Sequence, residues 1–237
     1  MNDKMKGIVT VFVDIDDTLW WFTENSKLAL RHTFDAFDIS SVCTYERFKE
    51  VYLKKNLELW NLYHHGLIDK DFLVNERFRF TLKECGYKGD VEKMCHLLDE
   101  EYLRFLALQP TTIPGARQLL EYLVAKGYDV NTLSNGFQGT QQQKLISGGL
   151  SDLIHRNVLS DDCGITKPQR GIFDYALEQC GAEAATTVMI GDNPDADIKG
   201  AHDAGWRTIY FNIRGLDPIE DTADAVVTSL DEVQQIL

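Results

Sequence analysis

The stretch VFVDIDDTL, residues 11–19, decides the fold of this chain and the position of its chemistry. Its first three residues are β-branched or aromatic, which is typical of a buried strand. The following loop carries three carboxylates, at Asp14, Asp16 and Asp17. One interpretation is a turn with N-capping aspartates, and another is a cation site. An EF-hand calcium loop is excluded, because the sixth residue from Asp14 is leucine and the twelfth asparagine, where that loop requires glycine and glutamate.

Short apolar runs of the same kind recur along the chain, and each is followed by a turn and a helical pattern. This alternation predicts the α/β fold class, with a Rossmann-like parallel sheet and crossover helices. One such helix spans 116–126, where the apolar residues form one stripe and Gly127 provides the C-terminal stop. The predicted strands are Ile8–Val13, Tyr128–Leu133, His155–Leu159, Thr187–Ile190, Thr208–Phe211 and Ala225–Val227.

The alternation is interrupted by a long helical segment from about Thr23 to about Ala107, rich in Leu, Phe, Lys and Glu. Such a length exceeds that of a crossover connection, so the segment is predicted to form a helical module inserted after the first strand. Pro110 marks the return to the sheet. We therefore expect an α/β core made of 1–22 and 108–237, and a helical domain made of 23–107.

Composition limits the partners of the chain. It contains 24 basic and 37 acidic residues, a formal net charge of −13, and 44% hydrophobic residues. The hydrophobic content suffices for a packed interior, while the negative charge opposes binding to nucleic acid polymers and to anionic membranes. An anionic small molecule remains a plausible ligand class if a cation, a lysine or helix N-termini reverse the field locally.

The cysteines and the N-terminus indicate the cellular compartment. The five cysteines are widely spaced and include no C-x-x-C pair, which is typical of reduced thiols. The apolar run Ile8–Val13 is too short for a signal peptide, and no stretch reaches the roughly 20 apolar residues of a membrane helix. We expect a cytoplasmic protein. The sequence does not indicate an oligomeric state.

Polar clusters follow two further predicted strands. Ser134-Asn135-Gly136 follows one of them, and residues 191–197, GDNPDAD, follow another. Because the carboxyl ends of parallel strands meet at one crevice, Asp14, Asp16, Ser134 and Asp192 are predicted to lie together. Lys167, in the segment GITKP at 164–168, precedes a helix and is within reach of the same crevice.

In this order, D-x-D-x-T, S-N-G, K-P and G-D-x-x-x-x-D resemble the motifs of the haloacid dehalogenase-like hydrolase superfamily. The resemblance covers the whole chain, since the inserted helical module is similar to the mobile cap of that superfamily. A closer likeness is to its bacterial pyrimidine-nucleotidase branch. That likeness is carried by Ser134-Asn135-Gly136-Phe137 with the Gln-rich 141–143, and by Lys167-Pro168 leading to 172–179, IFDYALEQ.

The resemblance implies a role for each motif residue. Asp14 would be the nucleophile and a metal ligand, and Asp16 the acid/base, with its backbone carbonyl on Mg²⁺. Asp192 would complete the metal ligands. Ser134 and the Asn135 amide would bind phosphoryl oxygens, and Lys167 would balance the charge on these oxygens. Thr18 would support the loop on the substrate-binding side of the site. Asp197 would orient Lys167 or a metal-bound water.

The chemistry agrees with these roles. A phosphate dianion repels a carboxylate, so attack by Asp14 requires a cation between them, and hard oxygen ligands suit Mg²⁺. Asp16 could protonate the leaving oxygen and then deprotonate the water that cleaves the aspartyl-phosphate. The sequence therefore predicts a Mg²⁺-dependent phosphatase acting on small phosphate monoesters.

Other polar and aromatic residues have simpler interpretations. For Trp20-Trp21-Phe22, packing is favoured over stacking on a nucleobase. His64-His65 is interpreted as a helix end and Asp195 as a surface residue.

The favoured substrate is a nucleoside 5′-monophosphate, with a sugar phosphate or phosphoglycolate as the alternative. A phosphomutase would share the first half-reaction. A haloacid dehalogenase is disfavoured because dehalogenases replace the second aspartate of D-x-D, which is Asp16 here. A non-catalytic phosphate-binding protein is disfavoured because such a descendant would have lost one of Asp14, Asp16, Lys167 or Asp192.

Overall fold

The structure, a computed structural model, describes residues 5–237. The chain divides into two compact units. The core unit contains the chain up to Phe22 and from Pro110 to Leu237, and the helical unit contains Thr23–Gln109.

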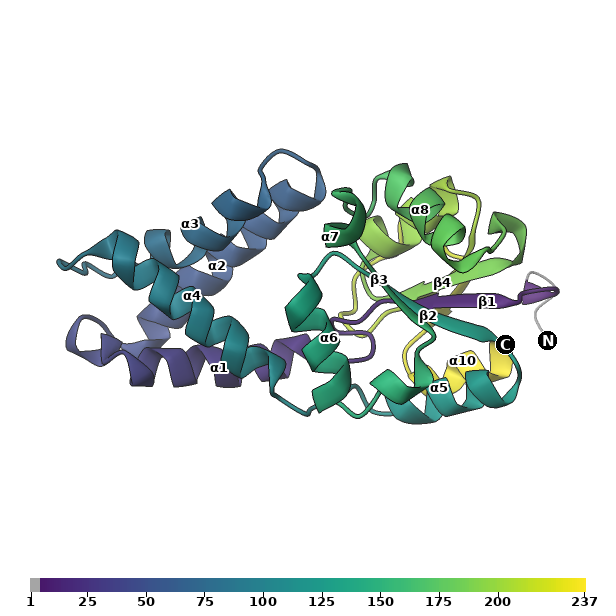
Figure 1. The fold of residues 1–237 in the computed structure, drawn as a ribbon, viewed down its shortest axis with the longest axis horizontal. Coiled ribbons are helices and arrows are strands. Elements are labelled where there is room, and N and C mark those ends of the chain that lie inside the picture. Colours follow the sequence, from purple (N-terminus) through teal and green to yellow (C-terminus); the bar gives the residue numbers. More distant parts are fainter. Residues whose placement is uncertain (1–4) are drawn as a thin grey trace. The chain divides into compact units, whose positions relative to one another are not determined.

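The core unit is built on a parallel sheet of six strands in the order β3-β2-β1-β4-β5-β6 (Figure 1). Every neighbouring pair is parallel, which confirms the predicted fold class. The strands are β1 Thr10–Val13, β2 Asp129–Ser134, β3 Arg156–Leu159, β4 Thr187–Gly191, β5 Arg207–Phe211 and β6 Ala225–Val227. All six predicted strands are present, with ends that differ by at most two residues.

The central strands are buried along their whole length, as expected when helices cover both faces of a parallel sheet. Figure 1 shows α5 and α10 on one face and α8 on the other. The helices of the core unit are α5 Ala116–Ala125, α6 Gln138–Ser147, α7 Ser160–Cys163, α8 Arg170–Cys180, α9 Gly200–Asp203 and α10 Leu230–Ile236, with short turns η3 Ser151–Leu153 and η4 Ala184–Thr186 and a π-helical turn, η5 Pro194–Lys199.

The order of the strands fixes where a ligand can bind. The chain moves outward from β1 through β2 to β3, then returns to the other side of β1 and continues from β4 to β6. The connections therefore diverge beyond the carboxyl ends of β1 and its neighbours, where open parallel sheets bind ligands. The register pairs Val13 with both Thr132 and Ile190, so these ends are level.

The helices of the helical unit are α1 Phe22–Ala36, whose first residue belongs to the core unit, η2 Ile39–Ser41, α2 Tyr45–His64, α3 Lys70–Glu84 and α4 Val91–Ala107. Thr44, Asp69 and Asp90 cap the N-termini of α2, α3 and α4 through their side-chain oxygens. The interior is aromatic, with ring centroids between 4.7 and 6.2 Å apart. Its rings are Phe48, Tyr52, Phe78 and Tyr102.

Among residues 5–237, none of the helices combines the length and the hydropathy needed to cross a lipid bilayer.

Candidate active site

Polar side chains gather at the carboxyl ends of β1, β2 and β4. Asp14 directly follows β1, Ser134 ends β2 and Asp192 directly follows β4. Each is at most 7% exposed. The structure thus brings together groups that lie as many as 178 positions apart in the sequence, as the strand pattern predicted.

Asp14 lies in a fixed and largely dehydrated position. Its backbone N–H donates to the carbonyl of Ile190 at 2.9 Å, and its Oδ1 accepts from Nζ of Lys167 at 2.7 Å. Burial raises the pKa of Asp14 to about 7, with Asp197 and Asp16 adding to the rise and Lys167 opposing it. A further positive charge would stabilise the carboxylate form, and only in this form can a carboxyl group act as a strong nucleophile or bind a metal ion.

Lys167 connects Asp14 to a second carboxylate. Its buried ammonium group donates to Oδ1 of Asp14, to Oδ1 of Asp197 at 2.6 Å and to the carbonyl of Leu133 at 2.6 Å. Burial alone would lower the pKa of Lys167, but the two carboxylates raise it above the usual value. Because an ammonium group has three donors, all three are engaged and the cation is held in one place.

The side chain of Asn135 holds the backbone of Lys167. Its Nδ2 donates to the Lys167 carbonyl at 2.9 Å, and its Oδ1 accepts from the Lys167 N–H at 2.8 Å. The sequence suggested only a backbone role for Asn135. The structure adds a side-chain role, because this pair of hydrogen bonds joins the end of β2 to the loop that carries the lysine.

Three buried carboxylates form a candidate metal site. Asp14, Asp192 and Asp197 each offer one oxygen, and these oxygens all lie within 4.8 Å of one another. Burial raises the pKa of Asp192, although Arg214 opposes the rise. Buried carboxylate oxygens are ligands that suit Mg²⁺, so this donor set fits that ion. The Asp16 side chain lies outside this set.

The turn η5 holds Asp197 in this set. The Asp197 Oδ2 accepts from the Asn193 N–H at 3.0 Å, and the Asn193 side chain accepts from the N–H groups of Asp195 and Ala196. Gly191 allows the arrangement, because a β-carbon there would overlap the Asp197 carboxylate. From the sequence, Asp197 was predicted to orient Lys167 or a metal-bound water, and in the structure it lies beside both Lys167 and the other two carboxylates.

The carboxylate of Asp16 faces α6. Its Oδ2 accepts from Nε2 of Gln141 at 2.9 Å, and its Oδ1 accepts from Nζ of Lys144 at 2.7 Å. Sequence reasoning named neither residue as part of the site. Their spacing of three positions places them on one helix face. The Gln-rich stretch 141–143, which carries part of the likeness to the nucleotidase branch, was the available clue to Gln141.

Ser134 is joined to the same group. Its Oγ accepts from the Gly136 N–H at 3.1 Å and from Nε2 of Gln141 at 2.6 Å. A hydroxyl has two acceptor sites and one donor, so these bonds leave its hydrogen to be donated. Ser134 is therefore well suited to donate to a phosphoryl oxygen.

Thr18 and Arg214 surround Asp192. The fully buried Thr18 hydroxyl makes a long hydrogen bond, 3.4 Å, to Oδ1 of Asp192. Nε of Arg214 lies 2.6 Å from Oδ2 of Asp192, at an angle outside hydrogen-bond geometry, and its NH2 group lies 3.4 Å from Asp17. Arg214 was missed because it lies in an irregular segment after β5 that carries no motif.

The remaining predictions concern residues beside the motifs. Trp20 is fully buried, which confirms packing for this ring, whereas Trp21 and Phe22 are partly exposed. His64 ends α2 and His65 bonds the Asn61 carbonyl, which confirms the helix end. All five cysteines are free thiols.

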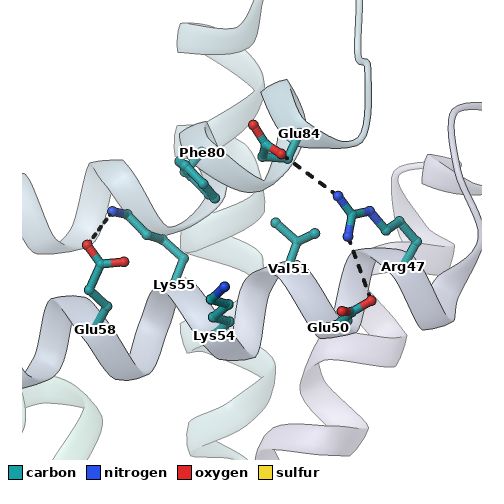
Figure 2. Close-up of a pocket in the computed structure, with 8 residues that line it drawn as sticks. All are labelled: Arg47, Glu50, Val51, Lys54, Lys55, Glu58, Phe80 and Glu84. Atoms are coloured by element: carbon teal, nitrogen blue, oxygen red, sulfur yellow. Dashed lines mark hydrogen bonds and ion pairs between the residues drawn. The ribbon is translucent and has the colours of Figure 1, made fainter.

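A hollow in the helical unit, between α2 and α3, carries none of the motif residues (Figure 2). Its charges are mostly paired. Arg47 lies between Glu50 and Glu84, at 3.7 and 3.8 Å, and Lys55 pairs with Glu58 at 2.9 Å. These basic side chains are neutralised by neighbouring glutamates, so they are poor binding partners for an anionic ester. The carboxyl end of the sheet therefore remains the candidate site.

Comparison with known proteins agrees with this geometry. A family model described as haloacid dehalogenase-like hydrolase matches residues 8–205. The protein "Pyrimidine 5'-nucleotidase YjjG" of Escherichia coli (strain K12) is 33% identical over 229 residues, 96% of each chain. The "Glyceraldehyde 3-phosphate phosphatase" of Pyrococcus furiosus is 28% identical over 254 residues, 98% of this chain and 94% of that one.

A solved structure shares the fold over nearly the whole chain. It is that of the putative HAD-hydrolase YfnB from Bacillus subtilis bound to magnesium, with a TM-score of 0.87 and 32% identity. The similarity covers 98% of this chain and 99% of that one.

Proposed function

The chain belongs to the haloacid dehalogenase-like hydrolases and is a hydrolase of phosphate monoesters, and we propose that it works through a phosphoryl group carried on Asp14. The observation that carries this proposal is the environment of Asp14. Its buried carboxylate follows β1, bonds Lys167 at 2.7 Å and shares a small volume with Asp192 and Asp197. We further propose that Mg²⁺ is the cofactor and that nucleoside 5′-monophosphates are the preferred substrates.

In the first half-reaction, a carboxylate oxygen of Asp14 forms a bond to phosphorus as the ester O–P bond breaks. The bonding electrons leave with the ester oxygen, which takes a proton from the carboxyl group of Asp16. The Ser134 hydroxyl donates to a phosphoryl oxygen, and the ammonium group of Lys167 balances the charge there. The products of this step are the free alcohol and an aspartyl-phosphate.

In the second half-reaction, water attacks the phosphorus of the aspartyl-phosphate. The carboxylate of Asp16 accepts a proton from this water, and the bond between phosphorus and Asp14 breaks. Inorganic phosphate leaves, while Asp14 returns as a carboxylate and Asp16 as a carboxylic acid. The same two side chains are thereby ready for another ester.

We propose that Asp14, Asp192 and the backbone carbonyl of Asp16 hold the metal, with Asp197 close by. When bound, Mg²⁺ neutralises the repulsion between the phosphate dianion and the attacking carboxylate. The magnesium-bound relative and the buried oxygens within 4.8 Å of one another support this assignment. Lys167, a cation of the chain itself, compensates part of the negative charge of Asp14 and Asp197.

The nucleotidase relative supports the choice of substrate, since the chain is 33% identical to it over 96% of both lengths. We propose that the helical domain predicted from the sequence, 23–107, acts as the cap whose residues select the leaving group. A sugar phosphate is the second candidate, supported by the relative named a glyceraldehyde 3-phosphate phosphatase. The two candidates share the site chemistry and differ only in the leaving group.

A phosphate-release panel tests the proposal. Purified protein is assayed with nucleoside 5′-monophosphates, sugar phosphates and phosphoglycolate, each with Mg²⁺ and with EDTA. We expect release that requires Mg²⁺, is fastest for a nucleotide, and is absent in Asp14→Asn. Equal turnover of all three classes would refute the substrate assignment, and turnover by Asp14→Asn would refute the mechanism. Conversion of a sugar phosphate to its isomer, dependent on a bisphosphate, would identify a mutase instead.

A further inference from the structure

Two residues of α6 lie against the side chain that the proposed mechanism uses as acid and base. Gln141 is fully buried and Lys144 is 3% exposed, although one is an amide and the other a cation. They donate to different oxygens of Asp16, at 2.9 and 2.7 Å. Each oxygen of the carboxylate therefore has its own donor, which fixes both the position of the group and its rotation.

Gln141 also links this carboxylate to the phosphate end of the site. The same Nε2 atom donates to Asp16 and, at 2.6 Å, to Oγ of Ser134. One amide group thus sets the separation between the proposed proton donor and the proposed phosphoryl ligand. Gly136 makes room for it, because a β-carbon at that position would overlap the Gln141 side chain.

Lys144 also lies close to two aromatic rings. Its Nζ lies 4.8 Å from the ring centroid of Trp20 and 5.3 Å from that of Phe22. Rings at this distance attract an ammonium group and restrict where it can move. The rings that follow the nucleophile loop therefore hold this lysine against Asp16.

The burial of these groups argues against a merely structural role. The Oε1 of Gln141 is buried and has no hydrogen-bond partner among residues 5–237. Such an atom lowers stability, and a leucine at this position would pack without that penalty. A buried lysine is similarly unfavourable unless its charge is paired, and the partner of Lys144 is Asp16. An amide and an ammonium group here are explained by what they do to Asp16.

We propose that Gln141 and Lys144 are positioning residues that orient the Asp16 carboxyl group toward the leaving oxygen of the ester. The inference rests on the proposed function, because it assigns these residues to the proton-transfer step of that reaction. It predicts that they matter for esters whose leaving group needs a proton. They should matter little for p-nitrophenyl phosphate, whose leaving group departs as a stable anion.

The test compares two leaving groups in single turnovers with enzyme in excess, so that only the first half-reaction is observed. The esters are p-nitrophenyl phosphate and the aliphatic ester that the wild-type protein hydrolyses fastest. The variants are Gln141→Leu and Lys144→Met. Gln142→Leu is the matched control, because Gln142 is the next residue of the same helix and is exposed.

We expect both variants to release the alcohol of the aliphatic ester at least about tenfold more slowly, since positioned acids contribute at least that much. The rate with p-nitrophenyl phosphate should remain near that of the wild type, and the enzyme concentration that gives half the maximal single-turnover rate should change little for either ester. Lys144→Arg should recover most of the lost rate. Gln141→Leu should melt at the wild-type temperature or above it.

Equal losses with the two esters, or no loss with the aliphatic ester, would overturn the positioning role. Failure of the proposed function would look different, because Asp14→Asn would then retain turnover. If Asp14→Asn is inert and the variants show no dependence on the leaving group, only the present inference is wrong.

Discussion

At the residue scale, the site is a balance of buried charges around Asp14. Lys167 contacts Asp14 and Asp197 at 2.7 and 2.6 Å, and all three side chains are almost fully buried. Burying a charge is unfavourable unless a partner compensates for it, so each group depends on the others. The position of the proposed nucleophile, Asp14, is therefore set by a neighbour 153 positions away in the sequence.

Replacing Lys167 by Met should expose this dependence. The variant removes the ammonium group that donates to both Asp14 and Asp197, and leaves these two carboxylates without that cation. We expect kcat to fall by about 10²–10³-fold, as when other preorganised donors are removed. Steady-state phosphate release measures this, with Lys199→Met as control, because the Lys199 side chain is 43% exposed and pairs only locally with Asp203. Wild-type kcat in Lys167→Met would contradict the role.

At the scale of elements, the strands were predictable and the polar face of one helix was not. The central strands are continuous apolar runs that end in motif residues, so both their existence and their ends are visible in the sequence. One face of α6 carries the buried polar residues Gln141 and Lys144, and the periodicity of a sequence does not identify the partner of a buried polar residue. Only the folded structure shows that they meet Asp16.

The turn after β4 depends on the absence of a side chain at Gly191. A β-carbon there would overlap the Asp197 carboxylate, which bonds Lys167. We expect Gly191→Ala to displace Asp197 and to lower kcat, although the change adds a single methyl group. Gly139→Ala is the control, because nothing lies within 4 Å of the new carbon and alanine favours a helix over glycine by about 0.5–1 kcal/mol. Steady-state kinetics and thermal melts of both variants distinguish a loss of catalysis from a loss of stability. An unchanged kcat in Gly191→Ala would contradict the predicted displacement of Asp197.

At the scale of the whole molecule, the two units have separate interiors. The core unit is built around the sheet, whereas the helical unit packs an aromatic cluster around a buried ion pair between Arg77 and Asp99. The sequence predicted a helical domain made of 23–107. It could not indicate which residues of that segment meet a substrate, because several faces of its helices carry similar periodic patterns.

Breaking the buried pair should affect the helical unit first. Arg77→Met leaves the Asp99 carboxylate without its cation, and such a loss usually destabilises by about 3–5 kcal/mol. We expect a lower denaturation midpoint for the helical unit, with Mg²⁺ affinity retained by the core unit. Urea unfolding and metal titration measure the two effects, and Arg77→Met/Asp99→Leu should recover stability. A simultaneous loss of metal binding in folded Arg77→Met would show that the two units are not independent in this respect.

The central claim is that Asp14 carries the phosphoryl group, and mass spectrometry of acid-quenched enzyme tests it most directly. Protein sampled during turnover is digested, and the peptide containing residues 11–19 is analysed. We predict a mass gain of one phosphoryl group on Asp14, present with Mg²⁺ and substrate and absent in Asp14→Asn. Two results would contradict this claim. One is an unmodified peptide from active enzyme under conditions that stop the second half-reaction. The other is a phosphoryl group carried on a residue other than Asp14.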